Sequence, residues 1–197
     1  MSSSTAKTKL ATAVRIVSVA PLAALVALTA MYFCADDIVV APWQFAVVAA
    51  CLTLLPVLAY PVHYALPKLR AKGRDGQRTL AIIFSCVGYV VLTIVALTTG
   101  FSQKLLIFAL TYLLSGVTLL VCRLFKLRPS GHCCGFVGSV AYLVAFVSPY
   151  FAFVALLAVA VVWACVALGR HTVAQCIVGS LVPVVALLIS SAIVLFV

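Results

Sequence analysis

Residues 132–168 read HCCGFVGSVAYLVAFVSPYFAFVALLAVAVVWACVAL, a stretch without Asp, Glu, Lys or Arg. The hydrocarbon core of a membrane is about 30 Å thick, so one spanning helix needs about 20 residues at ~1.5 Å each. The 37 residues of this stretch are too many for one span. Ser148-Pro149 lies near its middle, and the residue before a proline disfavours the helical conformation. The stretch therefore predicts two membrane helices joined by a tight turn.

The remainder of the chain is similarly apolar. Of 197 residues, 66% are hydrophobic and 8% are charged, whereas soluble domains usually have about 25% charged residues. The runs are continuous, unlike the alternating pattern of a membrane barrel. We therefore expect an all-α polytopic membrane bundle with about seven transmembrane helices. The other five apolar runs cover approximately residues 14–33, 43–66, 79–99, 104–123 and 172–197.

The domain organisation is simple at the level of sequence. Residues 1–10 are polar and rich in serine, which predicts a disordered cytosolic tail. The first apolar run is long for a signal peptide and no clean small-residue cleavage site follows it, so we interpret it as a spanning helix. No internal repeat is visible. Residues 11–197 are expected to form a single transmembrane domain.

The positive charge has an asymmetric distribution. A net charge of +10 would suggest nucleic acid for a soluble protein, but here the 13 Lys and Arg residues lie mostly in short connections between apolar runs. With seven helices, 12 of the 13 cations share one face and Lys104 lies opposite. The positive-inside rule then predicts a multi-pass cell-membrane protein whose basic face is cytoplasmic. Its partners are expected to be the bilayer and anionic headgroups rather than nucleic acid, and the oligomeric state stays open.

The numbers and positions of the acidic residues and cysteines exclude several classes of reaction. Glutamate is absent and the acids are Asp36, Asp37 and Asp75, so no paired carboxylates are available for two-metal or glycosidase chemistry. Cys133-Cys134 lacks the two-residue gap of zinc and redox motifs. Free cysteine in an apolar run behaves as a small hydrophobe, so we expect neither a metal nor a cofactor. The other six cysteines are scattered: Cys34, Cys51, Cys86, Cys122, Cys165 and Cys176.

Two histidines stand where apolar runs begin. His132 closes the string Arg128-Pro129-Ser130-Gly131-His132, and His171 opens the string that continues to Gln175. Two predicted spans separate the histidines, which places both at the same membrane face. Imidazoles can transfer protons or attack phosphorus, while cations and backbone amides hold phosphoryl oxygens. These residues predict phosphate chemistry on a lipid.

These strings resemble motifs of the type-2 phosphatidic acid phosphatase superfamily, which includes membrane lipid phosphatases and vanadium haloperoxidases. The second motif of that family, Pro-Ser-Gly-His, stands at residues 129–132. The third-motif histidine aligns with His171. Many bacterial membrane members carry His-Thr-x-x-Gln followed by glycine four residues later, a string that this chain has from His171 to Gly179. The resemblance covers about residues 70–190 and implies the helical core of that family.

The resemblance also implies roles for individual residues. His171 is the expected nucleophile, forming a phosphohistidine, and His132 protonates the leaving alkoxide and later activates water. Ser130 and Gly131 are expected to donate hydrogen bonds to phosphoryl oxygens. Gln175, one helical turn after His171, holds the other ring nitrogen of that histidine.

Basic residues complete the expected substrate site, and here the chain departs from the family pattern. Arg128, Lys72 and Arg78 are the expected phosphate-binding cations, although Lys72 and Arg78 are not in the register of the family's first motif. Cys165 stands where the third motif has arginine, and Gln175 stands where it has aspartate. The expected activity is metal-independent hydrolysis of a lipid phosphate or polyprenyl (di)phosphate.

Other interpretations stay open. The departures also fit a catalytically weak or inactive member that binds anionic lipid or has a structural role. Taken singly, each histidine also fits an interfacial residue that caps a helix. The basic segment 67–78 equally fits a solvated stretch attracted to headgroups.

Overall fold

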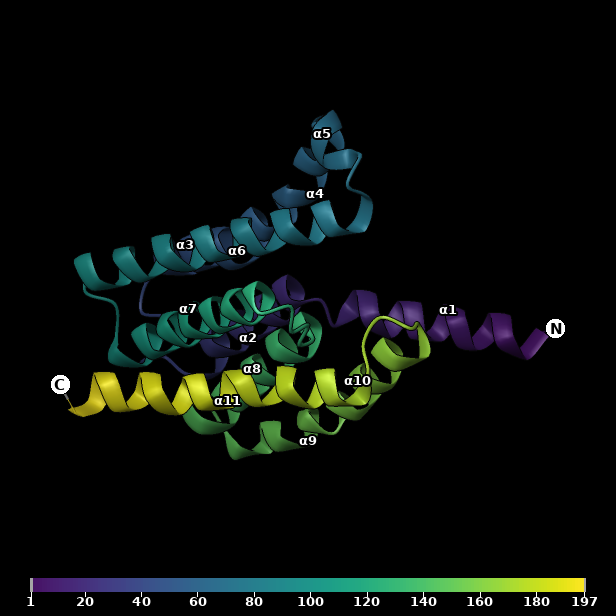
Figure 1. The fold of residues 1–197 in the computed structure, drawn as a ribbon. Helices are drawn as coiled ribbons and strands as arrows, with labels where there is room; N and C mark the ends of the chain where they lie inside the picture. Colours follow the sequence, from purple (N-terminus) through teal and green to yellow (C-terminus); the bar gives the residue numbers. More distant parts are fainter. Residues whose placement is uncertain (1, 197) are drawn as a thin grey trace.

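The computed structural model describes residues 2–196, and within that range all regular structure is helical (Figure 1). The helices are α1 (Ser2–Val17), α2 (Ala20–Cys34), α3 (Pro42–Ala49), α4 (Leu55–Ala65), α5 (Pro67–Arg70), α6 (Gly73–Thr98), α7 (Gln103–Leu124), α8 (Gly131–Phe146), α9 (Ala152–Ala155), α10 (Leu157–Ala167) and α11 (Val173–Phe196). A π-helical segment, Ala50–Leu54, joins α3 to α4, and a 3-10 turn, Pro149–Phe151, precedes α9.

Several helices are long and apolar enough to cross a membrane. Five stretches meet this condition by length and composition: Pro42–Ala65, Gly73–Thr98, Gln103–Leu124, Pro149–Ala167 and Val173–Phe196. The number rises to six if the bent pair formed by α1 and α2 counts as one span. Helix α8 is apolar but has only 16 residues. The predicted all-helical class is confirmed, and the five or six candidate spans are consistent with a multi-pass membrane protein.

The first apolar run differs from the single helix that its sequence predicts. It divides at Ser18-Val19 into α1 and α2, which are bent by 52° relative to each other. Pro21 lies in the first turn of α2 and has no amide hydrogen to continue a helix from α1, which favours the break. Helix α1 also includes residues 2–10, so this part of the predicted disordered tail is helical.

The break predicted within residues 132–168 is confirmed. Helix α8 ends at Phe146, and the Ser148 hydroxyl accepts a hydrogen bond from the amide of Tyr150 to start the next helical turn. In contrast, the stretch Pro42–Ala65 continues through two prolines as one candidate span. Its π-helical segment directly precedes Leu55 and Pro56, where a wider turn accommodates the missing amide.

Helices α7, α8 and α11 form the centre that positions the histidines. Helix α11 packs against α7 and α8, while α2 packs against α8 and α6 packs against α7 and α4. Edge-to-face aromatic contacts join Tyr89, Tyr112, Phe108 and Tyr142 between α6, α7 and α8. Helix α1 lies against α10 and extends toward the N-terminus, beyond the α10–α11 connection (Figure 1).

The two ends of the bundle differ in charge. We call one the Lys104 end; there the Lys104 ammonium pairs with Asp37 at 2.6 Å and the Ser102 hydroxyl donates to the Ile38 carbonyl. The opposite end, which we call the basic end, contains α1, the α4–α6 connection and the α10–α11 connection (Figure 1). There the Arg123 guanidinium donates to the Thr79 hydroxyl at 2.6 Å and so joins α7 to α6.

Candidate active site

The start of α8 is formed by the Ser-Gly-His turn. Ser130 is the N-cap, and its hydroxyl accepts a hydrogen bond from the Cys133 amide at 3.3 Å. The Ser130 side chain is fully buried. Serine is a preferred N-cap because its oxygen satisfies an amide that has no partner within the helix. The cap fixes the direction of α8, so that Gly131 and His132 occupy its first turn at the basic end.

The start of α11 is a capping box that also holds His171. The Gln175 amide donates to the Thr172 hydroxyl at 3.3 Å, and the Thr172 amide donates back to Gln175 Oε1 at 3.2 Å. His171 Nδ1 lies 3.2 Å from the same Oε1. Because an amide oxygen only accepts, Nδ1 is the donor, and in a neutral ring Nε2 keeps its lone pair. The arrangement leaves Nε2 of His171 as the ring nitrogen with a free lone pair.

The two helix starts are joined through the backbone of Ser130. Its amide donates to the Gln175 carbonyl at 2.9 Å. A side chain at Gly179 would bring a Cβ atom to 2.5 Å from the Ser130 carbonyl oxygen and 2.8 Å from its nitrogen. Only glycine therefore allows the turn to lie against α11. This close approach holds the segments that carry His132 and His171 beside each other.

The His132 ring has no hydrogen-bond partner at its buried Nε2 among residues 2–196. A buried polar atom without a partner costs free energy, so such an atom in a native site calls for a role. The ring interacts electrostatically with His171 and with three arginines: Arg15, Arg78 and Arg170. The two imidazoles therefore share one electropositive environment.

Burial and nearby charge act on the protonation of His171. Burial is the largest influence and lowers the pKa of His171, and the positive charges of Arg78 and Arg15 lower that pKa further. The hydrogen bond to Gln175 and the backbone of Arg128 act in the opposite direction. The net result is a lowered pKa, which favours the neutral ring that a nucleophile needs.

The predicted cations do not all reach the histidines. Arg78 interacts electrostatically with both imidazoles, and the Arg128 backbone lies against His171. Lys72 precedes α6 and is exposed, and none of the contacts found across residues 2–196 joins it to either histidine. Arg15 of α1 interacts electrostatically with both rings, a placement that the sequence analysis missed. No local pattern signals it, because it depends on α1 packing against α10.

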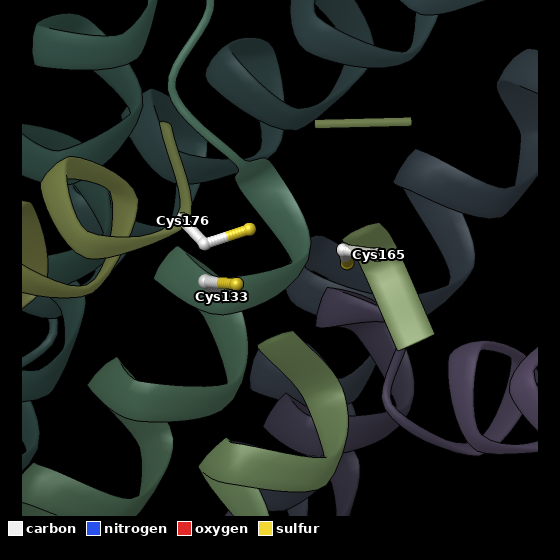
Figure 2. A group of neighbouring side chains, drawn as sticks. All are labelled: Cys133, Cys165 and Cys176. Carbon is white, nitrogen blue, oxygen red and sulfur yellow. The ribbon is translucent and has the colours of Figure 1, made fainter. Parts of the chain in front are cut away.

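Cys165 lies inside the helix contact rather than at the surface. Its side chain is 1% exposed, and its sulfur is 4.0 Å from the Ser130 hydroxyl. The sulfur atoms of Cys133, Cys165 and Cys176 all lie within 4.8 Å of one another (Figure 2). The three cysteines come from α8, α10 and α11, so their proximity was not visible in the sequence.

An apolar groove of about 290 Å³ runs between α7 and α11. Its lining is aliphatic except for one threonine: Leu114, Thr118, Val178, Leu181, Val182, Val185, Ala186 and Ile189. Val178 stands seven residues after His171, or roughly 10 Å along a helix. From Val178 the groove continues along α11 to Ile189, away from the basic end.

Comparisons of the chain with protein-family models, curated proteins and solved structures find no match.

Proposed function

We propose that this protein is an integral membrane phosphatase of the type-2 phosphatidic acid phosphatase superfamily, with seven crossings that include the bent pair and α8. Its substrate is a lipid phosphate or a polyprenyl (di)phosphate. The observation that carries the proposal is the contact of Ser130 with Gln175 and Gly179, which brings two histidine-bearing helix starts together beside arginines.

The reaction has two steps. His171 Nε2 attacks phosphorus, the bond from phosphorus to the lipid oxygen breaks, and protonated His132 gives its proton to the departing alkoxide. A phosphate dianion between the rings favours that protonated form, because an opposite charge stabilises a cation. Neutral His132 then takes a proton from water, the resulting hydroxide attacks phosphorus, the bond from phosphorus to His171 Nε2 breaks, and inorganic phosphate leaves.

Phosphoryl oxygens have two sources of positive potential in this arrangement. The N-termini of α8 and α11 direct amides and the positive ends of their dipoles toward the histidines. Arg15 and Arg78 add full charges that both imidazoles experience. Arg15 thus takes the part of the third-motif arginine, whose position is occupied here by buried Cys165.

The groove between α7 and α11 accounts for the apolar part of the substrate. Its aliphatic lining suits an acyl or isoprenyl chain, and Val178, at the end of the groove nearer the histidines in sequence, follows His171 by seven residues. The positive-inside rule orients the basic end toward the cytoplasm, so that the substrate headgroup is met in the inner leaflet.

A phosphate-release assay tests the proposal. The purified protein is incubated in detergent with phosphatidic acid, phosphatidylglycerol phosphate or undecaprenyl diphosphate, with and without vanadate. We expect release from at least one substrate, inhibition by vanadate, and loss of release in the His171→Ala variant. Lys104→Ala, at the opposite end, is the control and should retain release. No release from any substrate, or release that survives His171→Ala, would contradict the proposal.

A second function is favoured by the capping role of Gln175. Its side-chain oxygen already serves the Thr172 amide and carries no charge to stabilise an imidazolium. The same fold would then bind anionic lipid without turning it over. Flotation with phosphatidic acid vesicles, combined with absence of phosphate release, would identify this outcome.

A further inference from the structure

Three thiols from three helices converge behind the Ser-Gly-His turn. Cys133 lies in the first turn of α8, Cys165 near the end of α10 and Cys176 in the first turn of α11. Each is at most 1% exposed, and their sulfur atoms are all within 4.8 Å of one another (Figure 2). Together they form what we call the trithiol cluster.

The spacing of the sulfurs matches a coordination sphere. A metal bound at about 2.3 Å to three sulfurs in a plane holds those sulfurs roughly 4 Å apart. The separations of up to 4.8 Å in the cluster need only a small contraction. We propose that the trithiol cluster binds one soft d10 cation, Cu⁺ or Zn²⁺, the ions for which thiolate ligands are selective.

The coordination number separates the two ions. Cu⁺ is satisfied by three thiolates, whereas Zn²⁺ in proteins takes four ligands. The Ser130 hydroxyl, fully buried and 4.0 Å from the Cys165 sulfur, is a side-chain oxygen close enough to supply a fourth ligand after a small movement. Binding of either ion releases the thiol protons, because thiolates are the ligands.

The charge of the complex has a counterion nearby. Three thiolates with Zn²⁺ leave one negative charge, and with Cu⁺ they leave two. Arg15 interacts electrostatically with Cys165 and supplies a positive charge on that side of the cluster. An uncompensated buried charge would be costly, so this guanidinium makes the site more favourable.

The neighbouring Cys134 provides a matched control. It is buried in the same turn of α8, but it lines a separate cavity of about 40 Å³ together with Tyr112 and Ser115. It therefore shares the helix and the burial of Cys133 without joining the cluster. The bound ion would tie α8, α10 and α11 together, a role that is independent of whether the protein hydrolyses phosphate.

Metal titration of the reduced protein in detergent tests the proposal. Cu⁺ is presented with bicinchoninate as competitor and Zn²⁺ with a chromogenic chelator, both without oxygen. We expect one equivalent of at least one ion per chain, and X-ray absorption showing three sulfur ligands. Replacing any one of the three cysteines with alanine should weaken binding by about 100-fold or more, whereas Cys134→Ala should not.

A second measurement needs no variant. Wild-type protein is titrated with metal while the thiolate-to-metal charge-transfer absorbance and the protons released to the solution are followed. We expect both signals to saturate at one ion per chain, because thiolates are the ligands and the thiol protons leave on binding. Absence of stoichiometric binding by both ions, or binding that is unchanged in the triple alanine variant, would overturn the proposal. Neither result depends on phosphatase activity.

Discussion

The Lys104 end and the basic end of the bundle show two ways of placing charge beside a membrane. At the Lys104 end, one cation meets Asp37 at 2.6 Å, and the Tyr142 hydroxyl donates to the Lys104 carbonyl. At the basic end, 12 cations are accompanied by a single acid, Asp75. At the first end the cation is paired within the protein. At the second, positive charge remains available for an anion from outside, such as a phosphate headgroup.

The largest effect should come from replacing either of the two histidines at the basic end. We expect His171→Ala and His132→Ala each to reduce phosphate release by roughly 1,000-fold or more, since residues that act as a unit lose most activity singly. With p-nitrophenyl phosphate, which needs no proton donor, His132→Ala should accumulate phosphohistidine and His171→Ala should not. Equal labelling of both variants by p-nitrophenyl phosphate that carries a radioactive phosphoryl group would contradict the assigned roles.

The next largest effect should come from disturbing the contact between the starts of α8 and α11. Gly179→Ala places a Cβ atom against the Ser130 backbone, which neither segment can avoid without moving. We expect a loss of about 1–3 kcal/mol in the free energy of unfolding, as for other overpacked sites. Gly131→Ala is the control for stability, because a Cβ there meets nothing within 4 Å. Similar unfolding midpoints for the two variants would show that the approach at Gly179 is not tight.

Arg15, which approaches the two histidines from α1, should affect the affinity of the site for vanadate. Arg15→Gln is expected to weaken vanadate inhibition by roughly tenfold, since a hydrogen bond to a charged group contributes on the order of 1.5–3 kcal/mol. Lys104→Gln, which removes an equal charge at the opposite end, should leave inhibition unchanged. Equal weakening in both variants would mean that only the net charge matters.

The pH dependence should report the environment of His171. Its pKa is lowered by burial, so the ring stays neutral and active below the ordinary histidine value of about 6.5. Because the unfolded chain binds the proton more readily, stability falls as pH drops through that value. Gln175→Glu adds a carboxylate that favours the imidazolium, and the acidic limb should move up by about one pH unit. An acidic limb that does not move in Gln175→Glu would show that the ionisation of another group limits activity at low pH.

The smallest effect is expected where charge is already paired. The hydrogen bond from Lys104 lowers the pKa of Asp37, so the contribution of the pair is present above the ordinary carboxyl pKa and lost in acid. The pair is solvent-exposed, and Asp37→Asn should leave activity and the unfolding midpoint almost unchanged. A large fall in either quantity would show that the Lys104 end matters for the site.

The parts that could be predicted from sequence depend on local rules. The break at Ser148-Pro149 follows from length and from proline. The contact between His171 and Gln175 is predicted from a four-residue spacing on a helix, but His171 precedes α11 and the contact belongs to the capping box at the helix start. The bend at Ser18 also has a local cause, because Pro21 cannot continue a helix from α1. The position of Arg15 beside the histidines and the proximity of the three cysteines depend on tertiary packing, which leaves no periodic pattern in one sequence. The close packing of Ser130 against Gly179 likewise depends on tertiary packing and could not be predicted from the sequence.

The packing of Ser130 against Gly179 has a consequence for synthesis. The Ser-Gly-His turn leaves the ribosome well before α11, and its docking surface arrives only with Gly179. A nascent chain that has inserted α8 thus carries His132 without the partner that aligns it. Under the proposed function, reactivity toward phosphate would be acquired late, once α11 has joined α7 and α8.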